Sequence, residues 1–113
     1  MHFIEGDLIL PGELPADSAR AHVSVVDATY ADTAAAVLAE ADIVLNSHVQ
    51  GAVHFRLQLP QEVPANRRWL FDATVTADPS GSLAAGDYVL DRAVEWSEGS
   101  DRHHFRLYLV RVI

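Results

Sequence analysis

The chain has 113 residues, of which half are hydrophobic and 21% are charged, and its formal net charge at pH 7 is −8. This length predicts a single domain, residues 1–113, and the composition excludes both a disordered chain and a membrane-spanning helix. All eight basic residues are arginines, and so acidic a chain lacks the clustered cations that nucleic acid or an acidic membrane surface requires. We therefore expect a soluble globular protein with no nucleic-acid partner and no membrane span.

The chain contains no cysteine, which excludes thiol catalysis, disulfides and thiolate metal sites. Its first ten residues, MHFIEGDLIL, have no basic leader region, no uninterrupted apolar stretch and no small-residue cleavage site. As the sequence stands, we expect a cytoplasmic protein. The alternative is a periplasmic or envelope-associated protein in which Met1 replaces a removed signal peptide.

Alternation of apolar and polar residues predicts strands along most of the chain. Pro60 ends one of them because proline cannot donate a hydrogen bond to a ladder, and the cluster DPSGS predicts a turn at residues 78–82. In chain order the predicted strands are Phe3 to Leu10 with Gly6 as a bulge, His22 to Ala28, Val37 to Leu45, Val53 to Leu59, Trp69 to Val75, Tyr88 to Trp96 and Phe105 to Val112.

Two segments, 31–37 and 59–68, have helical character, and both are too short to cover a sheet. Short amphipathic strands can then bury their apolar faces only against one another. The predicted fold is all-β: an antiparallel β-sandwich of about seven strands, immunoglobulin- or transthyretin-like, with at most one or two short helical turns. A small closed barrel is the alternative.

The motif HFRL occurs twice, in HFRLQL from His54 to Leu59 and in HFRLYL from His104 to Leu109. The residues that flank the two copies do not match at the same offset, which disfavours an internal duplication. Both copies place Phe and Leu on one face and His and Arg on the other, as a half-buried strand requires. We interpret them as two strands that face a common core.

Three histidines are candidates for a metal site: His54, His103 and His104. Adjacent strand residues point to opposite faces, so His103 and His104 do not bind one ion without a turn between them. If the two HFRL strands were antiparallel neighbours in full register, His54 would lie opposite Tyr108, roughly 13 Å from His104 and too far to share an ion. A shifted register or a parallel pairing would bring them together. We favour solvated strand histidines, and no cofactor is predicted.

No other pattern predicts catalysis. Glu40 and Asp42 share one face of a strand, but any polar outer face offers such a pair of carboxylates. Ser100, Asp101 and His103 lie within one predicted turn, whereas the members of a catalytic triad converge from separate segments.

Three residues are candidates for contact with a binding partner. Of the two tryptophans, Trp69 falls on the same face of its predicted strand as the apolar residues and is expected in the core. Trp96 is therefore the better candidate for a partly exposed aromatic side chain. Arg67 and Arg68 form the only adjacent pair of cations and are candidates for anchoring an acidic partner.

The stretch VSVVDATYADTAAAVLAEADIVL at residues 23–45, followed by VHFRLQLPQEVPANRRWLFDATV at residues 53–75, resembles the YbaY and YscW family of small bacterial lipoproteins, which includes secretion pilotins. The matching features are a YAD bend, VLAE at the start of a strand, an FxLxLP strand, and PxNRRW leading into a strand with ATV. The resemblance covers residues 9–90 and implies a β-sandwich.

The resemblance also implies a function, because pilotins bind the tail of a secretin subunit and help it reach the outer membrane. The implied partner is a protein, either secretin-like or another envelope component. The chain departs from the family pattern in having neither a signal peptide nor a lipobox cysteine, and no functional residue of the family is assigned to a position here. We predict a non-enzymatic interaction module; the alternative is a metal-binding or metal-dependent hydrolytic protein that uses its surface histidines. The oligomeric state is left open.

Overall fold

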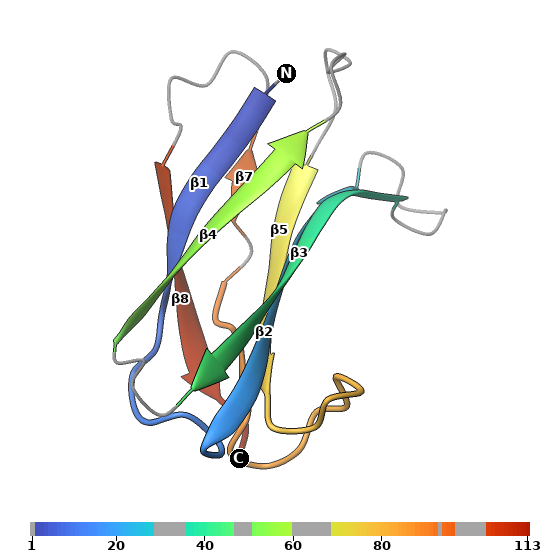
Figure 1. The fold of residues 1–113 in the computed structure, drawn as a ribbon. Helices are drawn as coiled ribbons and strands as arrows, with labels where there is room; N and C mark the ends of the chain where they lie inside the picture. Colours follow the sequence, from blue (N-terminus) through green and yellow to red (C-terminus); the bar gives the residue numbers. More distant parts are fainter. Residues whose placement is uncertain (1, 29–35, 47–50, 60–68, 93, 97–103) are drawn as a thin grey trace.

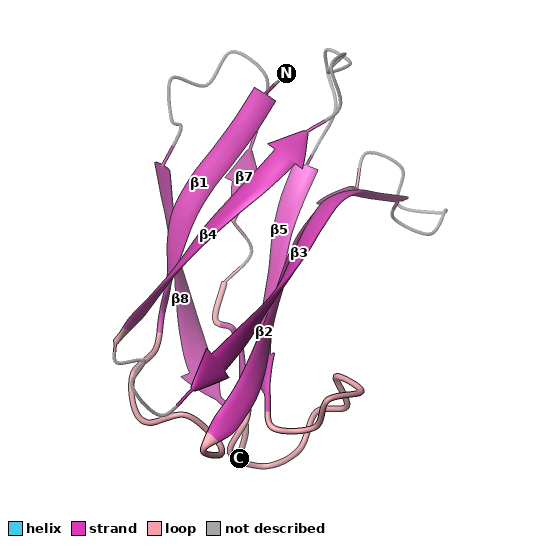
Figure 2. Cartoon of the chain, viewed as in Figure 1, coloured by secondary structure: helices cyan, strands magenta, loops and turns pink. Residues whose placement is uncertain are grey.

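The computed structural model describes residues 2–28, 36–46, 51–59, 69–92, 94–96 and 104–113 (Figure 1). These residues form strands, turns and loops, and they contain no helix (Figure 2). The strands are β1 (His2–Ile9), β2 (Ser18–Asp27), β3 (Ala36–Asn46), β4 (Ala52–Leu59), β5 (Trp69–Thr76), β6 (Tyr88–Leu90), β7 (Glu95–Trp96) and β8 (His104–Arg111). In this described part of the chain there is thus no helix long and apolar enough to cross a membrane. Of the segments predicted to form helical turns, 31–35 and 60–68 lie outside the described residues, whereas 36–37 belong to β3 and 59 ends β4.

The strands follow one hydrogen-bonded path in the order β3-β2-β5-β6-β8-β1-β4, and β7 pairs with β5 beside this path. The two end strands, β3 and β4, run alongside each other with Cα atoms within 8 Å, so the sheet is rolled into a nearly closed, barrel-like shape (Figure 1). The all-β prediction is confirmed. A sandwich of two separate sheets, immunoglobulin- or transthyretin-like, is not, because β8 pairs with both β1 and β6 and so joins the two halves.

One ladder departs from the predicted antiparallel arrangement. β1 pairs with β8 in parallel, in the register Glu5 to His104 through Ile9 to Tyr108, whereas the other ladders among the described strands are antiparallel. Parallel pairing needs a long connection, and β1 and β8 are the first and last strands of the chain. The strand periodicity does not reveal this pairing, because alternation is the same in both directions.

The two HFRL strands are β4 and β8, and each buries every second residue, as predicted. Phe55 and Phe105 both approach Phe71 on β5, with ring centroids 6.3 Å and 4.7 Å from its ring. They therefore face a common core, whose fully buried large side chains include Trp69 and Tyr88. The two strands are not neighbours, however, because β1 lies between them.

The predicted strand from Tyr88 to Trp96 is divided into β6 and β7. After Leu90 the chain bends; Asp91 N–H donates to the Tyr108 carbonyl and Phe71 N–H donates to the Val94 carbonyl. β6 is bonded to both β5 and β8, whereas β7 is paired only with β5.

Gly6 is not a bulge. It stays in register on both edges of β1, opposite Phe55 on β4 and Phe105 on β8, and the irregular register lies instead between Val25 and Val26. A Cβ atom at Gly6 would overlap the Phe105 carbonyl oxygen and would lie 2.6 Å from Cζ of Phe55. Glycine is therefore required here by close packing and not by backbone conformation.

Replacing Gly6 with alanine should lower the free energy of unfolding by about 1–3 kcal/mol, because the added methyl group meets a backbone oxygen as well as a ring. Denaturant titration of both variants measures this. Gly12→Ala is the matched control: there the nearest atom to an added Cβ is the flexible end of Arg111, at 2.9 Å. Equal effects of the two substitutions would contradict the packing explanation.

Candidate functional site

One cluster of charged side chains joins three strands on the outer surface. Asp7 on β1 lies between His54 on β4 and His104 on β8, because β1 pairs with both of these strands. Nε2 of His104 donates to Oδ2 of Asp7 at 3.0 Å, and Nδ1 of His54 lies 3.5 Å from Oδ1. The two imidazole rings are stacked with centroids 6.4 Å apart. The registers of the two ladders therefore place these three side chains on the same face, with one carboxylate between two histidines.

The observed positions of His54 and His104 differ from those expected if their strands were adjacent and antiparallel. β4 and β8 flank β1 on opposite edges, and the parallel β1–β8 ladder sets His104 diagonally across from His54, not four residues away. The hydrogen bond from His104 is the largest cause that lowers the pKa of Asp7 below its ordinary value of 3.8; the contact with His54 acts in the same direction, and partial burial opposes both.

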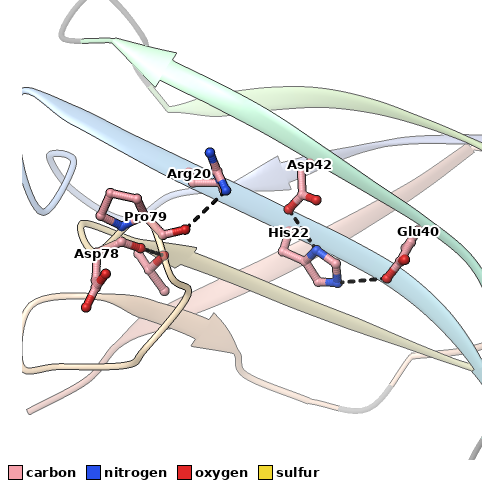
Figure 3. Close-up of polar contacts among 7 residues, drawn as sticks. Arg20, His22, Glu40, Asp42, Asp78 and Pro79 are labelled. Carbon is pink, nitrogen blue, oxygen red and sulfur yellow. Dashed lines mark hydrogen bonds and ion pairs between the residues drawn. The ribbon is translucent and has the colours of Figure 1, made fainter.

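A second cluster lies on the outer face of β2 and β3, where His22 is directly opposite Asp42 (Figure 3). Nδ1 of His22 lies 2.9 Å from Oδ1 of Asp42, and its Nε2 lies 3.6 Å from Oε2 of Glu40. The two carboxylates that shared one strand face in the sequence thus bracket a single imidazole. Since both ring nitrogens face carboxylates of β3, this histidine bridges two strands.

Beside His22 is a polar hollow of about 350 Å³. The predicted turn at residue 78 forms one wall: Gly81 N–H donates to the Asp78 carbonyl, and Ser80 N–H donates to the Asp78 carboxylate, which lowers the pKa of that group. Nη1 of Arg20 donates to the Pro79 carbonyl at 3.1 Å and holds the turn against β2 (Figure 3). The hollow is lined by Arg20, His22, Asp42, Thr74, Thr76, Pro79, Ser80 and Gly81.

The polar contacts of these histidines are with carboxylates. Each histidine described above is engaged with a carboxylate, and no hydroxyl group is bonded to any of these imidazoles in the contacts of the described residues. Within the described ranges, no group of three or more His, Cys, Asp or Glu side chains is placed to hold a metal ion. The hollow can offer hydroxyl groups, a guanidinium and carbonyl oxygens to a polar ligand.

The family model of the type III secretion system lipoprotein chaperone (YscW) matches residues 4–89, from β1 into β6. The chain belongs to the YscW family. This confirms the resemblance seen in the motifs of residues 23–45 and 53–75.

A solved structure of an alternative pilotin from the type II secretion system of Vibrio cholerae is similar to this YscW-family protein, with a TM-score of 0.81 and 22% sequence identity. The similarity covers 99% of this chain and 97% of the pilotin. At this identity it establishes a shared fold. The comparison with curated proteins returns no significant match.

The structure describes three of the six site residues predicted from the sequence, Trp96, His54 and His104. Arg67, Arg68 and His103 lie outside the described residues. For Trp96 the structure gives the position of the backbone, which pairs with that of Trp69, the first residue of β5. Among the described members of the predicted set, His54 and His104 approach each other.

Asp7, Arg20 and His22 were not singled out as site residues from the sequence. Each lies on the polar face of its strand, as many solvent-exposed residues do. They could be identified as site residues only when the neighbouring strand was known.

Asp7→Asn should lower the free energy of unfolding at pH 7 by roughly 0.2–1 kcal/mol, the usual range for a surface ion pair. A carboxylate whose pKa is lowered by folding stabilises the fold above its unfolded pKa, and this contribution disappears as pH falls through the lowered folded value. Denaturant titrations should therefore show the difference between wild type and variant shrinking below about pH 4. Asp72→Asn, an exposed carboxylate on β5, is the control; a difference that grows on acidification would contradict the assignment.

Zinc should leave the melting temperature unchanged, because no three His, Cys, Asp or Glu side chains of the described residues are placed to hold one ion. A site present only in the native state would add about 2.7 kcal/mol at one hundred times its Kd, which thermal-shift measurements detect easily. A saturable rise that disappears in His54→Ala or His104→Ala would overturn this expectation and favour the metal-dependent alternative.

Proposed function

We propose that this protein is a non-enzymatic, pilotin-like chaperone that binds a segment of a secretion-system protein. The observation that carries the proposal is the match of the YscW family model to residues 4–89, about three quarters of the chain. The shared fold with the Vibrio cholerae pilotin over nearly the whole of both chains supports it.

The geometry of the described surface also supports binding and not catalysis. Its two histidine clusters tie neighbouring strands together through Asp7 and through Glu40 with Asp42. None of these imidazoles is bonded to a hydroxyl group in the contacts of the described residues, so no activated nucleophile lies beside them there. Their arrangement is that of polar contacts between neighbouring strands.

The partner that we propose is a secretin-like component of a secretion system, and the place of action is the cell envelope. Both follow from the family description, which is that of a lipoprotein chaperone, and from the pilotin to which the fold is similar. Trp96, Arg67 and Arg68 stay in this proposal as candidate contact residues.

The test is a direct titration of the full chain with peptides that span the C-terminal tails of the secretins of its host, followed by fluorescence anisotropy. We expect one tail to bind saturably with a Kd on the order of 1 µM, about −8 kcal/mol. Deleting the gene in the host should also reduce the amount of assembled secretin.

Scrambled peptides of the same composition are the control, because an acidic chain attracts basic peptides without specificity. Equal binding of the native and scrambled tails, or no binding of any native tail, would contradict the proposed partner.

A further inference from the structure

The rolled sheet does not close. β3 and β4 are the ends of the strand order, and in the described residues no backbone ladder joins them although their Cα atoms come within 8 Å. Figure 1 shows the two strands running side by side along this seam. An end strand presents unpaired N–H and C=O groups to any extended segment that reaches it.

The two edges of the seam differ in how well their core-facing side chains are covered. On β4 these side chains are almost completely buried, with Val53 at 5% exposure and Phe55 at 1%. On β3, Leu45 of the corresponding row is 2% exposed, whereas Ala39, Ala41 and Ile43 are only partly buried and pack against the core. Burying this row further requires an additional element on the β3 side.

β3 has some of the features that normally protect an edge strand, namely the charged residues Glu40 and Asp42 and a shift of register in its ladder with β2, but it lacks others. At 11 residues it is the longest strand of the described chain, and between Ala36 and Asn46 it contains neither proline nor lysine. Val44 is 73% exposed and Val37 is 55% exposed. Length and exposed apolar residues favour the association of an edge strand with another chain, whereas the acidic residues of β3 restrict which chain can pair with it.

The outer face of β3 carries the charge that selects an occupant. Side chains of Glu40 and Asp42 are 60% and 57% exposed, and their partner in the described structure is His22, which is charged only when protonated. A strand added beside β3 would place its own outward side chains within about 5.5 Å of these carboxylates. Basic residues at those positions would be complementary to the two negative charges.

We propose that the free edge of β3 binds an extended segment of the secretion partner by strand addition, and that this segment alternates apolar and basic residues. Main-chain hydrogen bonds would hold the segment, as in other cases of strand addition. Its apolar side chains would cover Ala39, Ala41 and Ile43, and its basic side chains would face Glu40 and Asp42. The identity of the partner rests on the proposed function; the chemistry of the edge does not.

The experiment measures amide hydrogen exchange by NMR in the full chain, alone and with two probes: the secretin tail peptides, and a synthetic eight-residue peptide alternating valine and lysine. We expect slower exchange at every second amide of β3, because alternate residues of a strand direct their N–H groups to opposite edges. A docked helix would cover side chains without this alternation. A peptide alternating valine and glutamate is the control and should not bind.

The double variant Glu40→Lys/Asp42→Lys should weaken binding of the valine–lysine peptide about tenfold or more. Asp17→Lys/Asp91→Lys changes the net charge equally at exposed positions outside β3 and should retain binding. Circular dichroism and denaturant titration establish that both variants fold.

The outcomes separate the two proposals. Alternating protection of β3 by the valine–lysine peptide supports the edge site, and if no secretin tail binds, the proposed partner alone is wrong. A secretin tail that binds but protects other residues, such as those of the hollow beside His22, supports the proposed function and overturns the edge site. No protection of β3 by either probe also overturns it, as does equal weakening by the two double variants.

Discussion

The insertion of β1 between β4 and β8 is the constraint on which the rest of the structure depends. It requires a residue without a side chain at Gly6, where the backbone of β8 and the ring of Phe55 approach from opposite edges. With this contact in place, the first strand of the chain joins the last. The apolar faces of β4 and β8 then meet β5 around Phe71, and the separate amphipathic strands share one core.

The same placement decides which polar groups meet on the outer surface. A carboxylate on the middle strand of three can contact side chains from both of its neighbours, and Asp7 does so with His54 and His104. These contacts are exposed and modest in energy, so they align strands more than they stabilise the fold. The burial of apolar side chains beneath them supplies most of the stability.

Rolling the sheet also determines where it remains open. The strand order begins at β3 and ends at β4. The core-facing side chains of β4 are almost completely buried, whereas several of those of β3 are only partly buried. For a member of a family of secretion chaperones, an edge with unpaired backbone groups is a useful feature, because it can recognise a segment of a partner mainly through its main chain. Recognition of this kind needs no catalytic group.

The sequence by itself determined the local features: the strand periodicity, the burial of Trp69, the turn at residue 78 and the motifs that indicated the family. Each depends on neighbouring residues, since alternation, proline and turn chemistry act within a few positions. Tertiary structure alone decided the strand order, the parallel β1–β8 pairing, the split between β6 and β7, and the meeting of Asp7 with His54 and His104. The physical reason is that periodicity assigns a side chain to a face of its strand, whereas packing between residues far apart in the chain selects the neighbouring strand and its register.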